Sequence, residues 1–229
     1  MTVESLSRSV LADQVKERLL DDILSGRLPP GSRIIETKVA RRLGTSQAPV
    51  REALRGLEAL GLVEITPFRG SCVRRPTRRE VLEAYAVRSS LEALAAELAV
   101  PRAGDADVAE LGALFAGMQA AADSGDGHAL AEADARFHGR IVELADNATL
   151  LRVWRSLEPF SRTYITLALP GADAHWAAGL HEPILAAMGS HDSAAVTDAL
   201  RAHFEAIREN MARRWPAEDE PNGRAPDPK

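Results

Sequence analysis

The stretch Gly44–Val73, GTSQAPVREALRGLEALGLVEITPFRGSCV, decides the fold of the first part of the chain. Ser46 and Pro49 predict a helix start, because a serine hydroxyl can accept a bond from a free amide and a first-turn proline loses no hydrogen bond. Gly61 is a natural stop for this helix. Two short runs around Pro67–Gly70 then predict a β-hairpin. The buried stripe expected on the helix is Val50, Ala53, Leu54, Leu57 and Leu60.

Upstream of this stretch, Glu36–Gly44 (ETKVARRLG) predicts another short helix, and Arg27–Ile35 (RLPPGSRII) predicts a turn and an extended piece. A longer helix is expected from about Leu11 to Ser25. Two short helices that meet at a glycine turn and lead into a hairpin are typical of a winged helix-turn-helix. We expect the helix pair to bury Val39, Ala40, Leu43, Val50, Leu54 and Leu57.

One face of the second short helix is polar. Gln47, Arg51 and Arg55 follow one another at intervals of four residues, so they share an exposed side that can enter a major groove. Ser46, at the start of the helix, can meet a phosphate. The hairpin tip, Arg69–Gly70, can reach an adjacent groove or the DNA backbone. The alternative is a merely solvated face, which the pattern alone leaves open.

Residues 10–75 resemble the GntR family of bacterial winged-helix regulators. The family pattern around the second helix is Ser-Arg-Thr-Pro-Val-Arg-Glu-Ala-Leu, followed by a leucine and a Gly-Leu pair. The resemblance implies a module that reads double-stranded DNA, with a homodimer on a near-palindromic operator. The positions that match are Ser46, Pro49, Val50, Arg51, Glu52, Ala53, Leu54, Leu57, Gly61 and Leu62, with Pro30, Gly31, Ile34 and Glu36 upstream.

Three positions depart from this pattern. Gln47 and Ala48 replace the usual Arg-Thr pair, and Thr37 stands where an arginine often follows the glutamate. The resemblance implies that these positions touch DNA. Glutamine pairs bidentately with adenine, whereas arginine favours guanine. We therefore expect an operator that differs from the family consensus.

Charge divides the chain of 229 residues into two parts. Residues 1–76 carry 13 Lys and Arg against 9 Asp and Glu, and residues 77–229 carry 15 against 24. A basic module joined to an acidic one indicates that the first part meets a polyanion. No apolar run is long enough to span a bilayer, and the first residues lack a signal-peptide pattern, so we expect a cytoplasmic protein. Cys72 is the single cysteine, which excludes an internal disulfide.

The remainder of the chain, rich in alanine and leucine, predicts helices. We expect a mainly α protein with three parts: a winged helix-turn-helix domain (1–76), an all-helical domain (77–215) and a disordered tail (216–229). The helical domain should be an antiparallel bundle of six or seven helices, and it resembles the FCD branch of the GntR family. The predicted helices are 78–100, 105–123, 127–145, 148–169, 174–189 and 192–214.

Three predicted helices of this domain each carry a histidine on or beside an apolar face. Asp134 and His138 lie four residues apart and therefore share one face. His181 and His203 lie in two later helices. One such histidine usually makes a core hydrogen bond, so a bound metal and a satisfied core both stay open. Asp plus three His offers oxygen and nitrogen ligands that suit zinc, nickel or manganese.

The FCD resemblance implies that these four residues bind a divalent metal, zinc in the first place, with nickel or manganese as alternatives. Arg88 is a second inward charge, and it either pairs with Glu92 four residues later or grips a carboxylate. In the resembling family an arginine on this helix helps to bind organic acids. Arg162 and Tyr164 are further candidates for the cavity wall.

These features predict a transcription regulator, not an enzyme, in which a small carboxylate modulates operator binding. Repression with release by the ligand is the family's commoner mode, and we adopt it. A metal-dependent hydrolase is one alternative, although no general acid or base accompanies the cluster. A DNA-binding protein with a purely structural metal is another. The effector, the operator and the identity of the metal do not follow from the sequence.

Overall fold

Our computed structural model describes the backbone of residues 4–163 and 173–214, and the side chains of residues 10–157 and 173–214. The chain divides into two compact units, one formed by residues 1–75 together with 155–170 and the other by 76–154 and 171–229. No helix in the described part is long and apolar enough to cross a membrane. The predicted tail, 216–229, lies outside the described residues.

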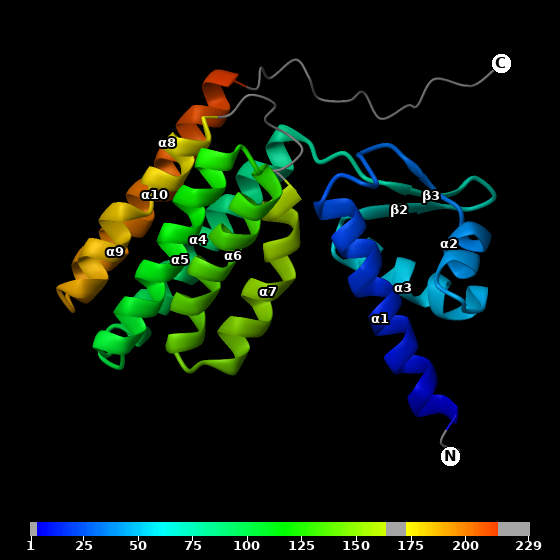
Figure 1. The fold of residues 1–229 in the computed structure, drawn as a ribbon, viewed down its shortest axis with the longest axis horizontal. Coiled ribbons are helices and arrows are strands. Elements are labelled where there is room, and N and C mark those ends of the chain that lie inside the picture. Colours follow the sequence, from blue (N-terminus) through cyan, green and yellow to red (C-terminus); the bar gives the residue numbers. More distant parts are fainter. Residues whose placement is uncertain (1–3, 164–172, 215–229) are drawn as a thin grey trace. The chain divides into compact units, whose positions relative to one another are not determined.

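The first unit is a winged helix-turn-helix, as predicted (Figure 1). Its elements are α1 (Glu4–Leu24), β1 (Arg33–Ile34), α2 (Glu36–Arg42), α3 (Gln47–Ala59), β2 (Val63–Thr66) and β3 (Gly70–Val73). The strands form one antiparallel sheet in the order β1-β3-β2, in which Thr66 pairs with Gly70 next to the hairpin turn. The sheet therefore presents this turn as the wing.

Buried apolar residues from every element of this unit join its core. The expected stripe of α3 is buried at Val50, Ala53, Leu54 and Leu57, and Leu60 is half-buried. Leu19 and Ile23 of α1 are fully buried against them. Helix α1 begins at Glu4, seven residues earlier than the periodicity predicted. Ser46 holds the N-cap position of α3, as predicted. The predicted hydrogen bond to its hydroxyl was wrong, because the side chain makes no cap hydrogen bond.

The second unit is a bundle of helices, as expected. Thr77 and Glu80 form a reciprocal capping box at the start of α4, and Asp126 caps α6 with its carboxylate. Helix α4 packs against α6 and α10, and α5 packs against α6, α8 and α9. The elements are α4 (Arg78–Ala99), α5 (Asp105–Ser124), α6 (Gly127–Leu144), α8 (Ala174–Gly179), α9 (Glu182–Gly189) and α10 (Ser193–Arg214), together with the part of α7 (Ala148–Thr163) up to Trp154.

The predicted single helix 174–189 was wrong, because two helices occupy this range. Helix α8 ends at Gly179, and α9 begins at Glu182 with Pro183 in its first turn. A proline inside a helix lacks the N–H group and clashes with the preceding turn, whereas at a helix start it costs nothing. The break places His181 at the N-cap of α9, buried between the two helices.

Candidate metal centre and DNA-reading face

The structure brings the four predicted ligands together in the helical unit. Asp134 and His138 project from successive turns of α6, His181 lies between α8 and α9, and His203 comes from α10. All four side chains are buried, and one ligand atom of each lies within 4.8 Å of the others. Zinc binds nitrogen and oxygen at about 2.0–2.2 Å, so ligands of one ion lie up to roughly 4 Å apart.

The shortest separations join three of these side chains. Nε2 of His181 lies 3.1 Å from Oδ1 of Asp134 and 3.1 Å from Nε2 of His138. Nε2 of His138 lies 3.8 Å from the same aspartate oxygen. Whether these three atoms attract or repel one another depends on which ring nitrogen of each histidine carries the proton. The hydrogen-bond partner of each Nδ1 determines this.

The outer nitrogen of His138 faces a carboxylate. Its Nδ1 lies 2.5 Å from Oε2 of Glu92, and both side chains are fully buried. Burial alone would raise the pKa of Glu92, but the charge of Arg88, with the hydrogen bonds from His138 and Trp154, lowers it to about 2. Because an ionised carboxylate only accepts, we assign the proton of neutral His138 to Nδ1. Its Nε2 then presents a lone pair to the cluster.

The outer nitrogen of His181 is oriented by the backbone. Its Nδ1 lies 3.1 Å from the carbonyl oxygens of both Ala177 and Ala178. A carbonyl also only accepts, so Nδ1 of His181 donates and Nε2 carries the lone pair. The end of α8 thus sets this tautomer just as Glu92 sets that of His138.

Lone pairs from His138, His181 and Asp134 therefore converge on one point. Without a positive charge between them, these buried atoms would repel one another. Either an additional proton or a cation resolves the conflict, and such outer partners are typical of histidines that ligate metals. Burial would raise the pKa of Asp134, but a proton shared with His181 and His138, together with the charge of Arg88, lowers it far below the ordinary value, so the carboxylate favours a positive charge at this point. The donor set therefore fits a divalent metal.

His203 completes the set as a neutral ligand. Its ring centroid lies 4.6 Å from that of His181 and 4.9 Å from that of His138. Burial lowers the pKa of His203 well below 6.5, because a charged imidazole would lose its hydration there. A neutral imidazole keeps a lone pair for a metal. Its Nδ1 is buried with no hydrogen-bond partner in the described part of the chain.

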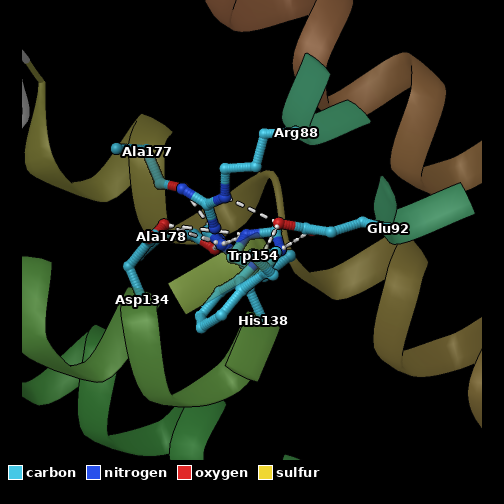
Figure 2. Close-up of polar contacts among 8 residues, drawn as sticks. Arg88, Glu92, Asp134, His138, Trp154, Ala177 and Ala178 are labelled. Atoms are coloured by element: carbon cyan, nitrogen blue, oxygen red, sulfur yellow. Dashed lines mark hydrogen bonds and ion pairs between the residues drawn. The ribbon is translucent and has the colours of Figure 1, made fainter. Parts of the chain in front are cut away.

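Glu92 also connects the cluster to Arg88 and Trp154, as Figure 2 shows. Oε1 of Glu92 accepts from Nε of Arg88 at 2.6 Å and from Nε1 of Trp154 at 2.7 Å. The ion pair expected between Arg88 and Glu92 is therefore present. Nη2 of Arg88 is buried and has no hydrogen-bond partner among the described residues. One donor of the guanidinium stays available, so the ion pair and a ligand-binding role are compatible.

Trp154 can reach Glu92 because α6 and α7 approach closely. A Cβ atom on Gly139 would lie 3.2 Å from the Trp154 ring, so a larger residue there would push the indole away. Arg162, at the end of α7, and Tyr164, beyond it, were predicted to line the cavity. Both side chains lie outside the described residues.

All eight predicted DNA-contacting residues are exposed on the winged helix-turn-helix unit. Thr37 belongs to α2, five positions line the start and face of α3, and two form the wing tip. The unit thus leaves a polar surface on the helix that was predicted to enter the groove. The exposed residues are Thr37, Ser46, Gln47, Ala48, Arg51, Arg55, Arg69 and Gly70.

The orientation of Arg51 depends on a neighbouring helix. Its Nη2 and Nε lie 3.0 Å and 3.4 Å from the two carboxylate oxygens of Glu36 on α2. This two-point contact holds the guanidinium in one plane while leaving more than half of the side chain exposed. In the wing, Nη2 of Arg33 donates to the carbonyl of Arg69 at 2.8 Å.

Sequence reasoning missed the supporting residues of both sites. Glu92 was seen only as a partner of Arg88, and Trp154 was not assigned to the site. The Asp134–His138 spacing gave no sign of either, because His138 and Glu92 are 46 residues apart in sequence. The one available signal was a glutamate on an apolar helix face, since a charged residue is rarely buried without partners.

Comparisons with known proteins cover both units. The model described as bacterial regulatory proteins, gntR family, matches residues 11–73, and the FCD domain model matches residues 83–206. The "Probable D-xylose utilization operon transcriptional repressor" of Paenarthrobacter nicotinovorans is 37% identical over 205 residues, which is 90% of either chain.

Solved structures give the same architecture. McbR/YncC of E. coli matches with a TM-score of 0.77 at 25% identity, over 90% of this chain and 98% of that one. A GntR transcriptional regulator from Rhodococcus sp. RHA1 also gives 0.77, at 24% identity, over 87% of this chain and 96% of that one. The second likeness concerns the fold alone.

Proposed function

The chain belongs to the GntR family of transcription regulators and carries an FCD domain, and from that premise we propose a metal-dependent sensor of small carboxylates. Residues 1–76 read an operator as the DNA-binding domain. Residues 77–215 hold a divalent metal, zinc first, and a carboxylate metabolite that modulates operator binding. Because its target is DNA, the protein acts in the cytoplasm.

One observation carries the proposal: the lone pairs of Asp134, His138 and His181 converge, with His203 beside them, inside the domain attached to a DNA reader. Asp134, His138, His181 and His203 are the residues that would hold the metal. The metal supplies a Lewis-acid centre that a carboxylate oxygen can ligate.

The charges around the cluster favour an anionic ligand. Arg88 is positive and Glu92 and Asp134 are negative, which leaves one negative charge when the histidines are neutral. A divalent metal changes this to one positive charge. A monocarboxylate then neutralises the buried site, and Nη2 of Arg88 is a donor for one of its oxygens. Arg162 and Tyr164 remain candidates from the sequence alone, because their side chains lie outside the described residues.

Operator reading requires two copies of the DNA-binding unit on two half-sites. A stripe on α4 supports a homodimer, since Val87 and Leu94 are seven residues apart on one side of the helix and are 49% and 43% exposed. The carboxylate shifts operator affinity only as far as it binds the two states of the dimer with different affinity. We adopt repression with release by the ligand.

The operons after which two relatives are named suggest which acids to test first. One relative is named for D-xylose utilization, and another, from Bacillus subtilis and 24% identical over 216 residues, is named for a gluconate operon. Sugar acids such as gluconate and xylonate carry a carboxylate beside a hydroxyl, two oxygens that one metal ion can take together.

The enzyme alternative has no support in the comparisons, because the matching families and relatives are transcription regulators. A purely structural metal remains the competing proposal. Under it, chelation lowers the stability of the helical domain while no carboxylate alters the affinity for DNA.

The test is a thermal-shift screen of carboxylic acids, sugar acids included, with and without zinc, nickel or manganese. We expect an acid that raises the melting temperature only when metal is present, and that same acid changes operator affinity in a band-shift titration. A complete screen without any metal-dependent acid would contradict the sensor proposal. Binding to duplex DNA by the N-terminal unit is scored separately in the band shift.

A further inference from the structure

The wing ends in an aromatic side chain that the fold does not bury. Phe68 lies in the turn between β2 and β3, and its side chain is 109% exposed. In the described part of the chain the next most exposed large apolar residue, Val10, reaches 56%. Figure 1 shows the hairpin turn at the free end of the sheet. Folding therefore gains no hydrophobic stabilisation from this ring.

The backbone at Phe68 is also strained. Its φ is +63°, in the left-handed region, which a bulky side chain disfavours. Among the described residues, the other non-glycine positions with positive φ are Asp146 and His191, residue types that tolerate this region better. A glycine or asparagine at position 68 would form the same turn with less strain. The phenylalanine is therefore costly to the fold in two ways, through exposure and through backbone geometry.

The turn that carries the ring is held in place. The amide of Arg69 donates to the carbonyl of Thr66 at 3.1 Å, and Thr66 pairs with Gly70 across the hairpin. From the neighbouring strand, Nη2 of Arg33 donates to the carbonyl of Arg69 at 2.8 Å. Phe68 is thus presented on a braced tip rather than on a loose loop.

The surroundings of the ring point to a polyanion as its partner. Pro67 precedes it and Arg69 follows it, both exposed, and the exposed Arg33 donates to the carbonyl of Arg69. Two guanidinium groups next to an apolar tip match a nucleic-acid groove, which offers phosphates at its edges and base faces inside. An apolar protein patch would leave both charges unmatched.

We infer that Phe68 is a wedge that the wing inserts between base pairs in the minor groove of the bound operator, with Arg69 beside it. Apolar wedges of this kind, phenylalanine and proline among them, partly unstack a base step and bend the duplex toward the major groove. Arginine inserted into a narrow minor groove adds electrostatic attraction. This inference rests on the proposed function, since it requires that the first unit binds DNA.

The test uses the full-length protein and duplexes that the wild-type protein selects from a random-sequence pool. Each duplex carries a donor and an acceptor dye at its ends to report bending, and 2-aminopurine at successive positions to report unstacking. Phe68→Asn removes the wedge and relieves the backbone, whereas Phe68→Leu keeps an apolar wedge. Melting temperature and size-exclusion elution are recorded for each protein.

We expect the wild type to bend the duplex and to brighten 2-aminopurine at one step per wing. Phe68→Asn should abolish both signals and weaken binding roughly tenfold, a loss typical of one aromatic contact with a base. Its melting temperature should equal or exceed that of the wild type, and Phe68→Leu should retain most of the bend. Unchanged binding and bending in Phe68→Asn would overturn the wedge, as would a change confined to self-association. Failure of the wild type to select any duplex would instead overturn the proposed function.

Discussion

Nδ1 of His138 lies 2.5 Å from Oε2 of Glu92, inside the helical unit, where both side chains are fully buried. This contact fixes the imidazole proton on the outer nitrogen and turns the inner one toward Asp134 and His181. The arrangement of the four ligands therefore depends on a glutamate that is not itself a ligand.

Glu92→Gln is expected to lower metal affinity by roughly 10- to 100-fold, the usual cost of losing such an outer partner. The amide is neutral and can present an N–H group, so it no longer fixes the tautomer of His138. The measurement is a competition titration with a chromogenic chelator. Glu97→Gln, an exposed change on the same helix, is the control. Equal metal affinity in the two variants would show that Glu92 does not position His138.

Arg88→Lys is expected to weaken binding of the carboxylate without weakening binding of the metal. Lysine keeps a positive charge beside Glu92 but lacks the Nη2 donor, so metal content should stay near that of the wild type. Affinity for the acid should fall by about tenfold or more, because a hydrogen bond to a charged group contributes roughly 1.5–3 kcal/mol. Calorimetric titration of the acid into metal-loaded protein measures this. Arg79→Lys, on the exposed side of α4, should bind the acid normally.

The stability of the metal-free protein should fall as the pH drops below 6.5. The pKa of His203 is lowered in the fold, so the unfolded chain binds a proton that the folded chain refuses. The contribution of His203 to the free energy of unfolding is complete above pH 6.5. Below that pH it decreases by up to about 1.4 kcal/mol per pH unit. Glu92, with a pKa of about 2 in the fold, adds a second loss of stability. This loss begins as the pH falls below about 4.5, the ordinary pKa of a glutamate.

Urea unfolding of chelated protein from pH 8 to pH 5 measures this dependence. His203→Gln should flatten the slope between pH 6.5 and pH 5, because it removes the group that titrates only in the unfolded state. His175→Gln, an exposed change on α8, should leave the slope as it is. A wild-type midpoint that stays level through this range would contradict the assignment of a neutral, buried His203.

Gln47→Arg should change which base the protein prefers. Glutamine pairs with adenine and arginine with guanine, and a good bidentate pair contributes about 1–3 kcal/mol of discrimination. Duplexes selected from a random pool should therefore exchange an adenine for a guanine at one position in each half-site. Gln14→Arg on α1, outside the reading face, adds the same charge as a control. If the wild type already selects the family consensus, the departures at Thr37, Gln47 and Ala48 do not alter specificity.

The sequence allowed the fold to be predicted where the signals are local. The helices of the reader follow from apolar periodicity, and the hairpin follows from the turn at Pro67–Gly70. The break between α8 and α9 was missed although its signal, Pro183, was visible. The φ of Phe68 has no sequence signature, because a turn of this kind would usually be read as needing glycine or asparagine.

The site was predictable only in part for a related reason. The spacing of four residues places Asp134 and His138 on one face, but which helices face them is a tertiary property. Their place on or beside apolar helix faces made His181 and His203 candidates, and the resemblance to a family joined them to this pair. Nothing comparable supplied Glu92 or Trp154, whose contacts join residues 46 and 62 positions apart. Which nitrogen carries a proton also emerged only from the partners in the structure.

The measurement that tests the central proposal most directly is operator affinity, with and without the screened acid, in the presence of metal. The wild type and His175→Ala should change affinity when acid is added. Asp134→Ala and His138→Ala should bind the operator normally, contain less metal and show little response to the acid, because the reader and the sensor are separate. A full response in Asp134→Ala, or none in the metal-loaded wild type, would contradict the account.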